Sequence, residues 1–399
     1  MSEFPKNKFL PIILAFLFCS TLVACGGSGE EPSTPPPILA PEPTPEPTPE
    51  PEPESPPHSR LPIAVHGKAT LYAGSLEDDP SIACGRVNST DPLESRFGRG
   101  ANSMVAAPDG SLYLTDHPCG TPPFTHAIRK IDANGVVTTV ANSVLDFEES
   151  SPLTGFVLPN GIAVDRENNV YVSDARDPKG SMSETHCYDG EFPSGPGPFP
   201  RGRRSGVWKI SPNGDISIFA GVYGPPEDQP LVMDGMGPLA RFTYPGPLAF
   251  SSDGTLHLID DIASLGSYRT IDANGVVTTR ASRYFPLVVA SPQGEVFATT
   301  NCLYRSDAMS DLVNVATGEI AAADVPNPLV VAVDSAGSVF STSPPRYDVP
   351  MTIYRKKAGE AVFVPVATNV HQPRAMAVGP DGALYIKSVY AVIRIKFNG

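Results

Sequence analysis

A stretch of nine residues, IDANGVVTT, occurs twice in this chain, at Ile131–Thr139 and again at Ile271–Thr279. Each copy lies in a longer matching frame, because NSMVAAPDGSLYLTD precedes the first and GPLAFSSDGTLHLID precedes the second. Looser copies recur along the chain, and aligning all of them on their first turn gives turn residues at Gly110, Asn168, Gly254, Gly294, Gly337 and Gly382. The chain therefore contains an internal repeat, which restricts it to folds built from similar units.

Each copy of the repeat contains short apolar, β-branched runs separated by Asp-Gly, Asn-Gly or similar pairs, a pattern typical of strands joined by tight turns. Four-stranded units at a spacing of about 40 to 45 residues predict the blades of a β-propeller. Gly/Pro-rich insertions, between Asp174 and Gly206 and between Val222 and Phe242, explain two longer spacings. We expect IDANGVVTT to form the hairpin between the third and fourth strands, with Asn-Gly supplying a positive φ at both turn positions.

The two ends of the repeat predict how the ring closes. The last copy stops at Asn398-Gly399, directly after its third strand. Near the N-terminus, Lys68–Ser75 (KATLYAGS) matches a fourth strand and belongs to no other copy. We therefore predict an all-β fold, a six-bladed β-propeller closed by an N-terminal strand that completes the last blade and so removes the exposed sheet edges.

Residues 1–24 have the features of a signal peptide. Lys6 and Lys8 precede the apolar run Phe9–Val23, which is too short for a comfortable membrane span. The run leads into LVACG, which resembles the lipobox of bacterial lipoproteins. This resemblance implies lipidation of Cys25, and the glycine after it implies sorting to the outer membrane of the bacterial cell envelope. The alternative is an ordinary secretory signal in which Cys25 is incidental.

Residues 25–60 are expected to be a tether, and residues 61–399 the folded domain. Between Glu31 and Pro57 the chain is a Pro-Glu-Thr tract with little to bury, which favours extended polyproline II. The formal net charge of the chain is −14, and the tether glutamates account for only part of it. An acidic domain lacks the Lys/Arg clusters that nucleic acids require, so no nucleic-acid partner is expected.

Four cysteines lie in the predicted domain, namely Cys84, Cys119, Cys187 and Cys302. In an oxidising compartment they permit two disulfides and three connectivities. All four fall in connections on one face of a propeller. Cys84 and Cys119 flank the first blade and are the favoured first pair, and Cys187, in the long insertion, is then a partner for Cys302.

The frame resembles the NHL-repeat family of β-propellers, in the form common in bacterial envelope proteins. The best matches are Pro159–Asp174, Ile128–Ile131 and Val136–Ala141, and the resemblance covers about residues 64 to 399. A Pro-Leu pair also precedes a phenylalanine ahead of the first strand in three copies. We expect these rings to wedge between blades: Phe97, Phe156 and Phe242.

Sites in propellers usually lie at the channel mouth where the first strands begin, because the loops of all blades converge there. The alignment assigns six residues to this ring: Asn102, Asn160, Gly246, Pro286, Leu329 and Arg374. The related six-bladed gluconolactonase family holds Ca²⁺ with carboxylate and amide oxygens at this place, and the resemblance to it is confined to Pro159-Asn160-Gly161. No metal or cofactor is therefore expected. Arg374, beside Asn102 and Asn160, is the candidate for binding a carboxylate.

The remaining ionisable residues are interpreted as structural. NHL propellers include a zinc lyase acting on peptidylglycines, but the histidines lack the short spacing of a zinc pair: His117, His126, His186 and His257. Three aspartates that end second strands are expected to tie the following loop through backbone N–H groups: Asp116, Asp174 and Asp260. Asp165 and Asp334 are expected to cap turns.

The sequence favours a lipid-anchored binding or scaffold protein whose loop-rich face binds an envelope protein, a peptide or a glycan. The membrane would be contacted through the N-terminal lipid, and the long loop after Asp174 would be the recognition element. Whether the protein is an enzyme stays open, with the balance against it, because no nucleophile motif is present. The alternative is a metal-dependent hydrolase or lyase, gluconolactonase-like or peptidylglycine-lyase-like, with its site at the channel mouth.

Overall fold

The chain divides into two compact units, Met1–Pro56 and Pro57–Gly399. The computed structural model describes only residues of the second unit: 61–77, 79–100, 103–119, 125–143, 155–175, 205–222, 232–260, 267–281, 285, 287–300, 310–327, 330–344 and 349–398. Within these ranges, no helix has the length and apolar character needed to cross a membrane. The predicted signal peptide, Cys25 and the tether lie outside the described residues.

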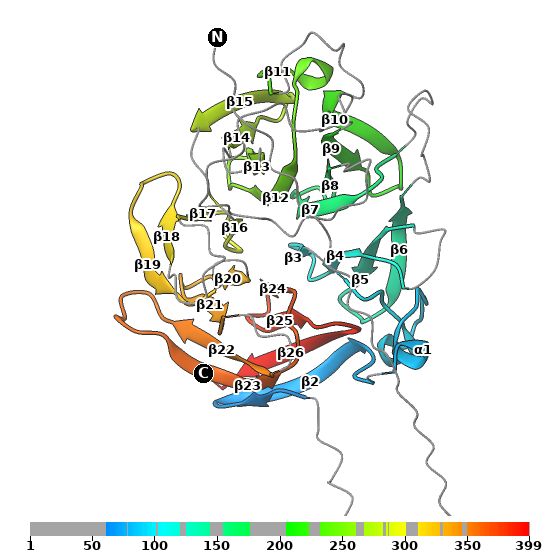
Figure 1. Ribbon diagram of the computed structural model, residues 1–399, viewed down its shortest axis with the longest axis vertical. Coiled ribbons are helices and arrows are strands. Elements are labelled where there is room, and N and C mark those ends of the chain that lie inside the picture. Colours follow the sequence, from blue (N-terminus) through cyan, green and yellow to red (C-terminus); the bar gives the residue numbers. More distant parts are fainter. Residues whose placement is uncertain are drawn as a thin grey trace, which may run out of the picture. The chain divides into compact units, whose positions relative to one another are not determined.

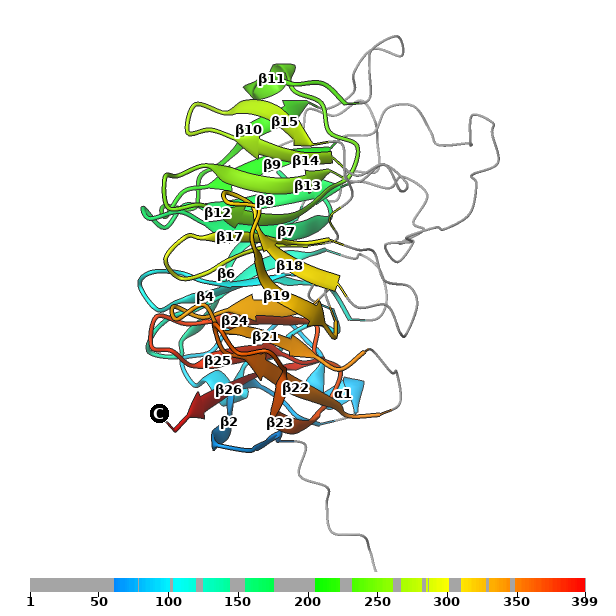
Figure 2. The same cartoon turned by 90° about the vertical axis from the view of Figure 1, so that its left-hand side faces the viewer.

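Six small antiparallel sheets stand in a ring around a central axis (Figure 1), and Figure 2 shows the same blades edge-on. From the axis outwards, the first blade consists of β3 (Met104–Ala106), β4 (Leu112–Asp116), β5 (Ala127–Ile131) and β6 (Val137–Asn142). The second blade consists of β7 (Pro159–Val164), β8 (Val170–Ala175), β9 (Ser205–Ile210) and β10 (Ile216–Val222). The third blade consists of β12 (Pro245–Phe250), β13 (Leu256–Asp260), β14 (Ser267–Ile271) and β15 (Val276–Ala281), with β11 (Gly235–Met236) outermost.

The fourth blade consists of β16 (Val288–Ala290), β17 (Val296–Thr299), β18 (Ser310–Asn314) and β19 (Ile320–Val325). The fifth consists of β20 (Val331–Val333), β21 (Val339–Thr342), β22 (Met351–Lys356) and β23 (Val364–Val370), with β1 (Ile63–Ala64) outermost. The sixth consists of β24 (Ala375–Val378), β25 (Leu384–Lys387), β26 (Ala391–Phe397) and β2 (Gly67–Gly74). Short helical turns form α1 (Pro80–Ala83), η1 (Pro92–Glu94) and η2 (Gly237–Leu239). The protein is an all-β, six-bladed β-propeller.

The N-terminal strand closes the ring as predicted. β2 pairs antiparallel with β26, from Gly67 opposite Phe397 to Gly74 opposite Ala391. The last blade therefore takes three strands from the C-terminus of the chain and one from the N-terminal part of the domain. The ring is therefore closed by the hydrogen bonds between β2 and β26.

The turn residues of the repeat were predicted correctly at all six first turns. Each has a positive φ: Gly110 (84°), Asn168 (61°), Gly254 (85°), Gly294 (80°), Gly337 (77°) and Gly382 (72°). A β-branched residue at any of them would strain the turn.

The turn within IDANGVVTT differs from the prediction. Only Gly135 has a positive φ there, of 89°, and Asn134 does not. The reason is Asp132, whose Oδ1 accepts from the N–H groups of Asn134 and Val136, both at 2.9 Å. This side chain closes a four-residue turn that needs a left-handed residue only at its last position.

The hydrophobic core is divided into clusters that lie between neighbouring blades. Each of the six clusters takes apolar side chains from two adjacent sheets. The three phenylalanines predicted to act as wedges are buried in such clusters, with Phe97 between the sixth and first blades, Phe156 between the first and second, and Phe242 between the second and third. Packing therefore runs around the ring rather than across its centre.

Candidate functional site

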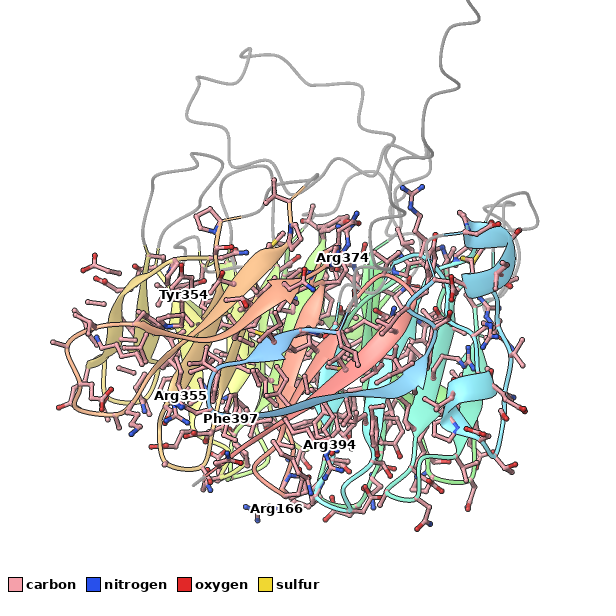
Figure 3. All side chains as sticks on the ribbon, turned by 90° about the horizontal axis from the view of Figure 1, so that it is seen from below. Arg166, Tyr354, Arg355, Arg374, Arg394 and Phe397 are labelled. Atoms are coloured by element: carbon pink, nitrogen blue, oxygen red, sulfur yellow. A yellow bond between two sulfur atoms is a disulfide. The ribbon has the colours of Figure 1, made fainter. Side chains whose placement is uncertain are left out.

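A cavity of about 740 Å³ runs along the axis of the ring, and the innermost strands of all six blades line it. Its upper mouth, where these strands begin, includes Asn160 and Arg374. Its lower mouth, formed by the turns that follow the innermost strands, includes Arg166 and Ser251. Figure 3 shows Arg374 and Arg166 on opposite sides of the domain. The two mouths therefore carry different side chains.

The predicted ring of mouth residues is described at three of its six positions. Asn160 and Arg374 line the cavity, and a Cβ built on Gly246 would lie 3.8 Å from Nδ2 of Asn160. The other three predicted members lie outside the described residues: Asn102, Pro286 and Leu329. The alignment of the repeat thus brought Asn160 and Arg374 to one mouth, although they are far apart in the sequence.

Arg374 presents an exposed cation at the upper mouth. Its backbone N–H donates to the carbonyl oxygen of Lys387 at 2.8 Å, which fixes the main chain on the edge of β25. Its guanidinium lies 3.4 Å from Oε1 of Gln372, a weak contact with a neutral group. No carboxylate within the described parts of the chain forms an ion pair with it.

Lys387 is a second cation behind this mouth, and it is fully buried. Its Nζ donates to the carbonyl oxygens of Ser388 and Val389, both at 2.7 Å, and lies 5.5 Å from the ring centroid of Phe97 in the next blade. Burial lowers the pKa of Lys387 to about 8, while the negative charge of Asp116 opposes that shift. Lys387 adds positive potential to the mouth without being exposed to solvent.

Replacing Lys387 with Met should change how stability depends on pH. Because the folded-state pKa is depressed from 10.5 to about 8, the folded protein loses the Lys387 proton at a lower pH than the unfolded chain does. The free energy of unfolding of the wild type should therefore rise relative to K387M, by about 2 kcal/mol between pH 7.5 and 9.5. Urea unfolding at both pH values measures this difference in the free energy of unfolding, and replacement of the exposed Lys396 with Met is the control. Parallel pH profiles of the wild type and K387M would contradict the prediction.

The three aspartates that end second strands are fully buried and do not form an acidic site. Within the described ranges they accept from backbone N–H groups of the loop that precedes the innermost strand, and the loops that follow, to which the prediction referred, lie largely outside those ranges. Asp174 accepts from the N–H groups of Val157 at 3.0 Å and Leu158 at 2.7 Å. Asp260 accepts from Thr243 and Tyr244, both at 2.9 Å. The folded ring brings these preceding loops next to the strand ends.

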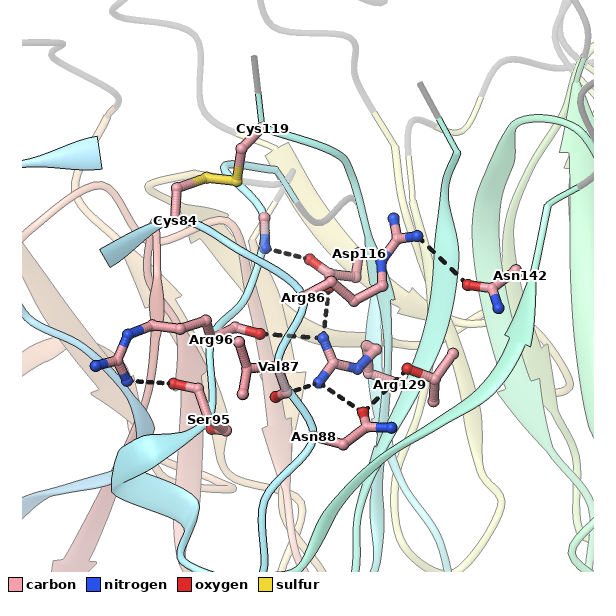
Figure 4. A network of polar contacts seen from close by, with 12 residues as sticks. Cys84, Arg86, Val87, Asn88, Ser95, Arg96, Asp116, Cys119, Arg129 and Asn142 are labelled. Atoms are coloured by element: carbon pink, nitrogen blue, oxygen red, sulfur yellow. Dashed lines mark hydrogen bonds and ion pairs between the residues drawn. A yellow bond between two sulfur atoms is a disulfide. The ribbon is translucent and has the colours of Figure 1, made fainter. Parts of the chain in front are cut away.

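Two of these aspartates also pair with buried arginines. Asp116 accepts from Arg129 at 2.9 Å, and Arg129 also donates to the carbonyl oxygens of Arg96 and Val87 and to Asn88, as Figure 4 shows. Arg269 and Asp260 repeat this network in the third blade, also at 2.9 Å. These ion pairs fix the entry loops between blades, so the carboxylates of Asp116 and Asp260 are structural. Asp165 and Asp334 cap turns, as predicted.

The structure brings together two histidines that the sequence interpretation treated separately. The ring centroids of His117 and His126 lie 4.8 Å apart, with the rings nearly perpendicular. Nε2 of His117 and Nδ1 of His126 are buried without a hydrogen-bond partner among the described residues. Burial lowers the pKa of His117 to about 4 and that of His126 to about 3, so both are neutral at pH 7. Their spacing of nine residues is not that of a zinc pair, and the antiparallel pairing of β4 with β5, in which Asp116 lies opposite Ala127, brings them together.

Two of the four predicted domain cysteines, Cys84 and Cys119, lie within the described ranges. Cys84 and Cys119 form a disulfide with their Cα atoms 6.0 Å apart (Figure 4). Cys187, Cys302 and His186 lie outside the described residues, as does the long insertion after Ala175. Among the residues that the structure describes, no three His, Cys, Asp or Glu side chains come together as a metal site would require.

Comparison with known proteins identifies similar folds but no close relative. No family model and no curated protein matches the chain. Its fold is similar to that of a gluconolactonase from Xanthomonas campestris, with 11% identity over 84% of this chain and 100% of that chain and a TM-score of 0.48. It is also similar to a glucose dehydrogenase, with 13% identity over 76% and 98% and a TM-score of 0.46, and to a streptogramin B lyase, with 12% over 76% and 97% and a TM-score of 0.41.

At such identities a likeness concerns the fold alone, and it transfers no substrate, cofactor or residue to this chain. The fold assignment itself rests on the six sheets and their closure by β2. The function must therefore be argued from the side chains.

Proposed function

We propose that this protein is a binding protein that takes up a carboxylate-bearing peptide or glycan at the upper mouth of its channel. The observation that carries the proposal is Arg374, an exposed guanidinium at the rim of the channel cavity. A guanidinium binds a carboxylate through two parallel hydrogen bonds, which gives direction as well as affinity. Asn160 contributes an amide at the same rim, and Lys387 adds long-range attraction for an anion.

The proposal is tested with matched acids and their neutral counterparts. We expect an N-acetyl dipeptide acid, or glucuronate, to bind more tightly than the dipeptide amide or glucose, by isothermal titration calorimetry. Replacing Arg374 with Ala should weaken binding of the acid at least about tenfold, because a charged hydrogen bond contributes about 1.5–3 kcal/mol. Arg166→Ala, at the lower mouth, is the control and should leave the affinity unchanged. If acid and neutral probe bind equally well, or if R374A binds like the wild type, the proposal fails.

The second candidate is a metal-dependent hydrolase or lyase, favoured by the two neutral imidazoles of His117 and His126. Neutral imidazole nitrogens with free lone pairs are the ligands that Zn²⁺ prefers. The positive charge of Arg86 close to His126 opposes a cation, which is why this candidate stands second. Excess Zn²⁺ should raise the melting temperature above that in EDTA by about 5 °C, since a ligand of the folded state stabilises it, and His126→Gln should remove the rise. No rise with Zn²⁺ would eliminate this candidate.

We further propose that the chain is an NHL-repeat protein of the bacterial cell envelope, lipid-anchored at Cys25 in the outer membrane and held there by its Pro/Glu-rich tether. The support is the lipobox-like LVACG, the composition of residues 25–60 and the repeat frame itself. Labelling of the full chain with a radioactive fatty acid in cells checks the anchor, and labelling that persists in Cys25→Ser would refute it.

A further inference from the structure

The innermost strand of each blade is an edge strand of its sheet, and its free edge lies along the channel (Figure 1). Hydrogen bonding in an antiparallel pair alternates, so every second residue of an edge strand directs its N–H and C=O groups away from the neighbouring strand. After β24, the N–H of Gly379 donates to the carbonyl oxygen of Ala383 at 3.0 Å, and β24 itself stays in register with β25. Met376 and Val378 therefore direct their backbone groups into the channel.

The same alternation holds in all six blades, because the N–H of the residue that follows each innermost strand donates across the next turn. The residue just before it consequently directs its N–H and C=O groups into the channel: Ala106, Val164, Phe250, Ala290, Val333 and Val378. Backbone groups of this kind need hydrogen-bond partners, which are supplied by water or by an added strand.

β24 offers the longest regular edge of the six. It pairs with β25 over four residues without a register shift, whereas β3, β16 and β20 each pair over three. Register shifts interrupt the pairing of β7 and β12, and Pro245 and Pro247 in β12 have no N–H. β24 also begins directly after Arg374, so its edge starts at the cation of the upper mouth.

The charges along the channel define the direction of an added strand. Among the described residues that line the cavity, Arg374 is the one charged side chain at the upper mouth. The charged side chains at the lower mouth nearly cancel: Asp165, Glu167, Asp253, Arg166 and Lys209. A terminal carboxylate is therefore attracted to the upper mouth. Because β24 runs from the upper to the lower mouth, a peptide with its carboxyl end at Arg374 runs antiparallel to β24, as β25 does.

The size of the cavity restricts the side chains of such a peptide. Arg374 and Pro380 both line the cavity, and six residues of strand span about 20 Å. Divided by this length, the volume of about 740 Å³ gives a mean cross-section of about 37 Å². A strand in stacked sheets occupies roughly 48 Å², the product of a strand spacing of about 4.8 Å and a sheet spacing of about 10 Å. The channel therefore admits an extended backbone with small side chains and excludes aromatic ones.

We propose that the channel binds the carboxyl-terminal segment of a peptide with small side chains as an added strand along β24. The terminal carboxylate lies at Arg374, and two alternate residues of the peptide exchange N–H···O=C hydrogen bonds with Met376 and Val378. This inference rests on the carboxylate binding proposed above and adds the class of ligand, a peptide and not a glycan. Main-chain hydrogen bonds give the affinity, and the width of the channel selects the side chains.

The first test titrates the full chain with N-acetyl-tetra-alanine, which has a free carboxyl end, by isothermal titration calorimetry. Four analogues each carry lactic acid in place of one alanine, which replaces one N–H donor by an ester oxygen of similar size. Because every second residue of an added strand faces β24, two analogues at alternate positions should bind about fivefold more weakly, the effect of one hydrogen bond. The other two should bind like the parent peptide.

Hydrogen exchange resolved to single residues gives the matching readout on the protein. At saturation with N-acetyl-tetra-alanine, the N–H groups of Met376 and Val378 should exchange about tenfold more slowly. Those of Ala375 and Ala377 already pair with β25 and should not change. A tetrapeptide acid with tryptophan at its third position should not bind, because its indole exceeds the width of the channel.

The outcomes separate this inference from the carboxylate binding on which it rests. Equal affinities of all four lactic acid analogues, or unchanged exchange at Met376 and Val378, would mean that no strand is added along β24, even where R374A still weakens binding. Binding of glucuronate without binding of tetra-alanine would overturn the peptide class and leave the carboxylate site standing. If N-acetyl-tetra-alanine and its amide bind equally well, both proposals fail.

Discussion

Replacing Asp260 with Ala should lower the free energy of unfolding by about 3–5 kcal/mol, because the buried guanidinium of Arg269 loses its buried counter-ion and keeps only the exposed Asp234 at 3.0 Å. Arg269 is fully buried, donates to Asp260 at 2.9 Å, and lies 4.6 Å from the ring centroid of Phe242. The N–H groups of Thr243 and Tyr244 would lose their acceptor at the same time. Urea unfolding followed by tryptophan fluorescence and circular dichroism measures the loss.

An exposed carboxylate provides the control for this prediction. Glu319 lies on the surface of the fourth blade, and its replacement by Ala should change the free energy of unfolding by less than about 0.5 kcal/mol. Asp116→Ala should behave like D260A, because Arg129 and Asp116 form the same network in the first blade. A loss below about 1 kcal/mol in both aspartate variants would mean that these networks do not hold the entry loops.

A chain that begins at residue 76 should fail to unfold cooperatively. It lacks β2, which covers the last blade by pairing with β26 along seven residue pairs. Ala73 is fully buried in the cluster between the sixth and first blades, and Tyr72 packs against Tyr385 with ring centroids 5.1 Å apart. Without β2 the edge of β26 is exposed, and an unpaired edge of apolar residues promotes aggregation. Denaturation curves and size-exclusion chromatography measure the effect.

The matched truncation for this experiment begins at residue 58. It removes the first compact unit, Met1–Pro56, and keeps both β1 and β2. Its unfolding midpoint should equal that of the mature chain. If the chain starting at residue 76 unfolds with the same midpoint and remains monomeric, then β2 does not close the ring in the way that its pairing indicates.

The architecture could be predicted from the sequence because the copies of the repeat can be aligned with one another. Six copies fixed the number of blades, the unmatched KATLYAGS identified the closing strand, and the Pro-Leu pairs led to the wedging rings of Phe97, Phe156 and Phe242. These features depend on local periodicity and on turn chemistry, which operate over a few residues. The detail that was wrong, a positive φ at Asn134, failed because Asp132 supplies a side-chain acceptor that the Asn-Gly rule does not consider.

The sequence by itself determined the fold, its closure and the upper-mouth position of Asn160 and Arg374, because each follows from counting along the repeat. Only the tertiary structure decided which ionisable groups meet. It paired Asp260 with Arg269, brought His117 against His126 and set Ser251 beside His257. Such contacts depend on side-chain direction and on the desolvation of charges between blades, and neither has a signature in spacing along the chain.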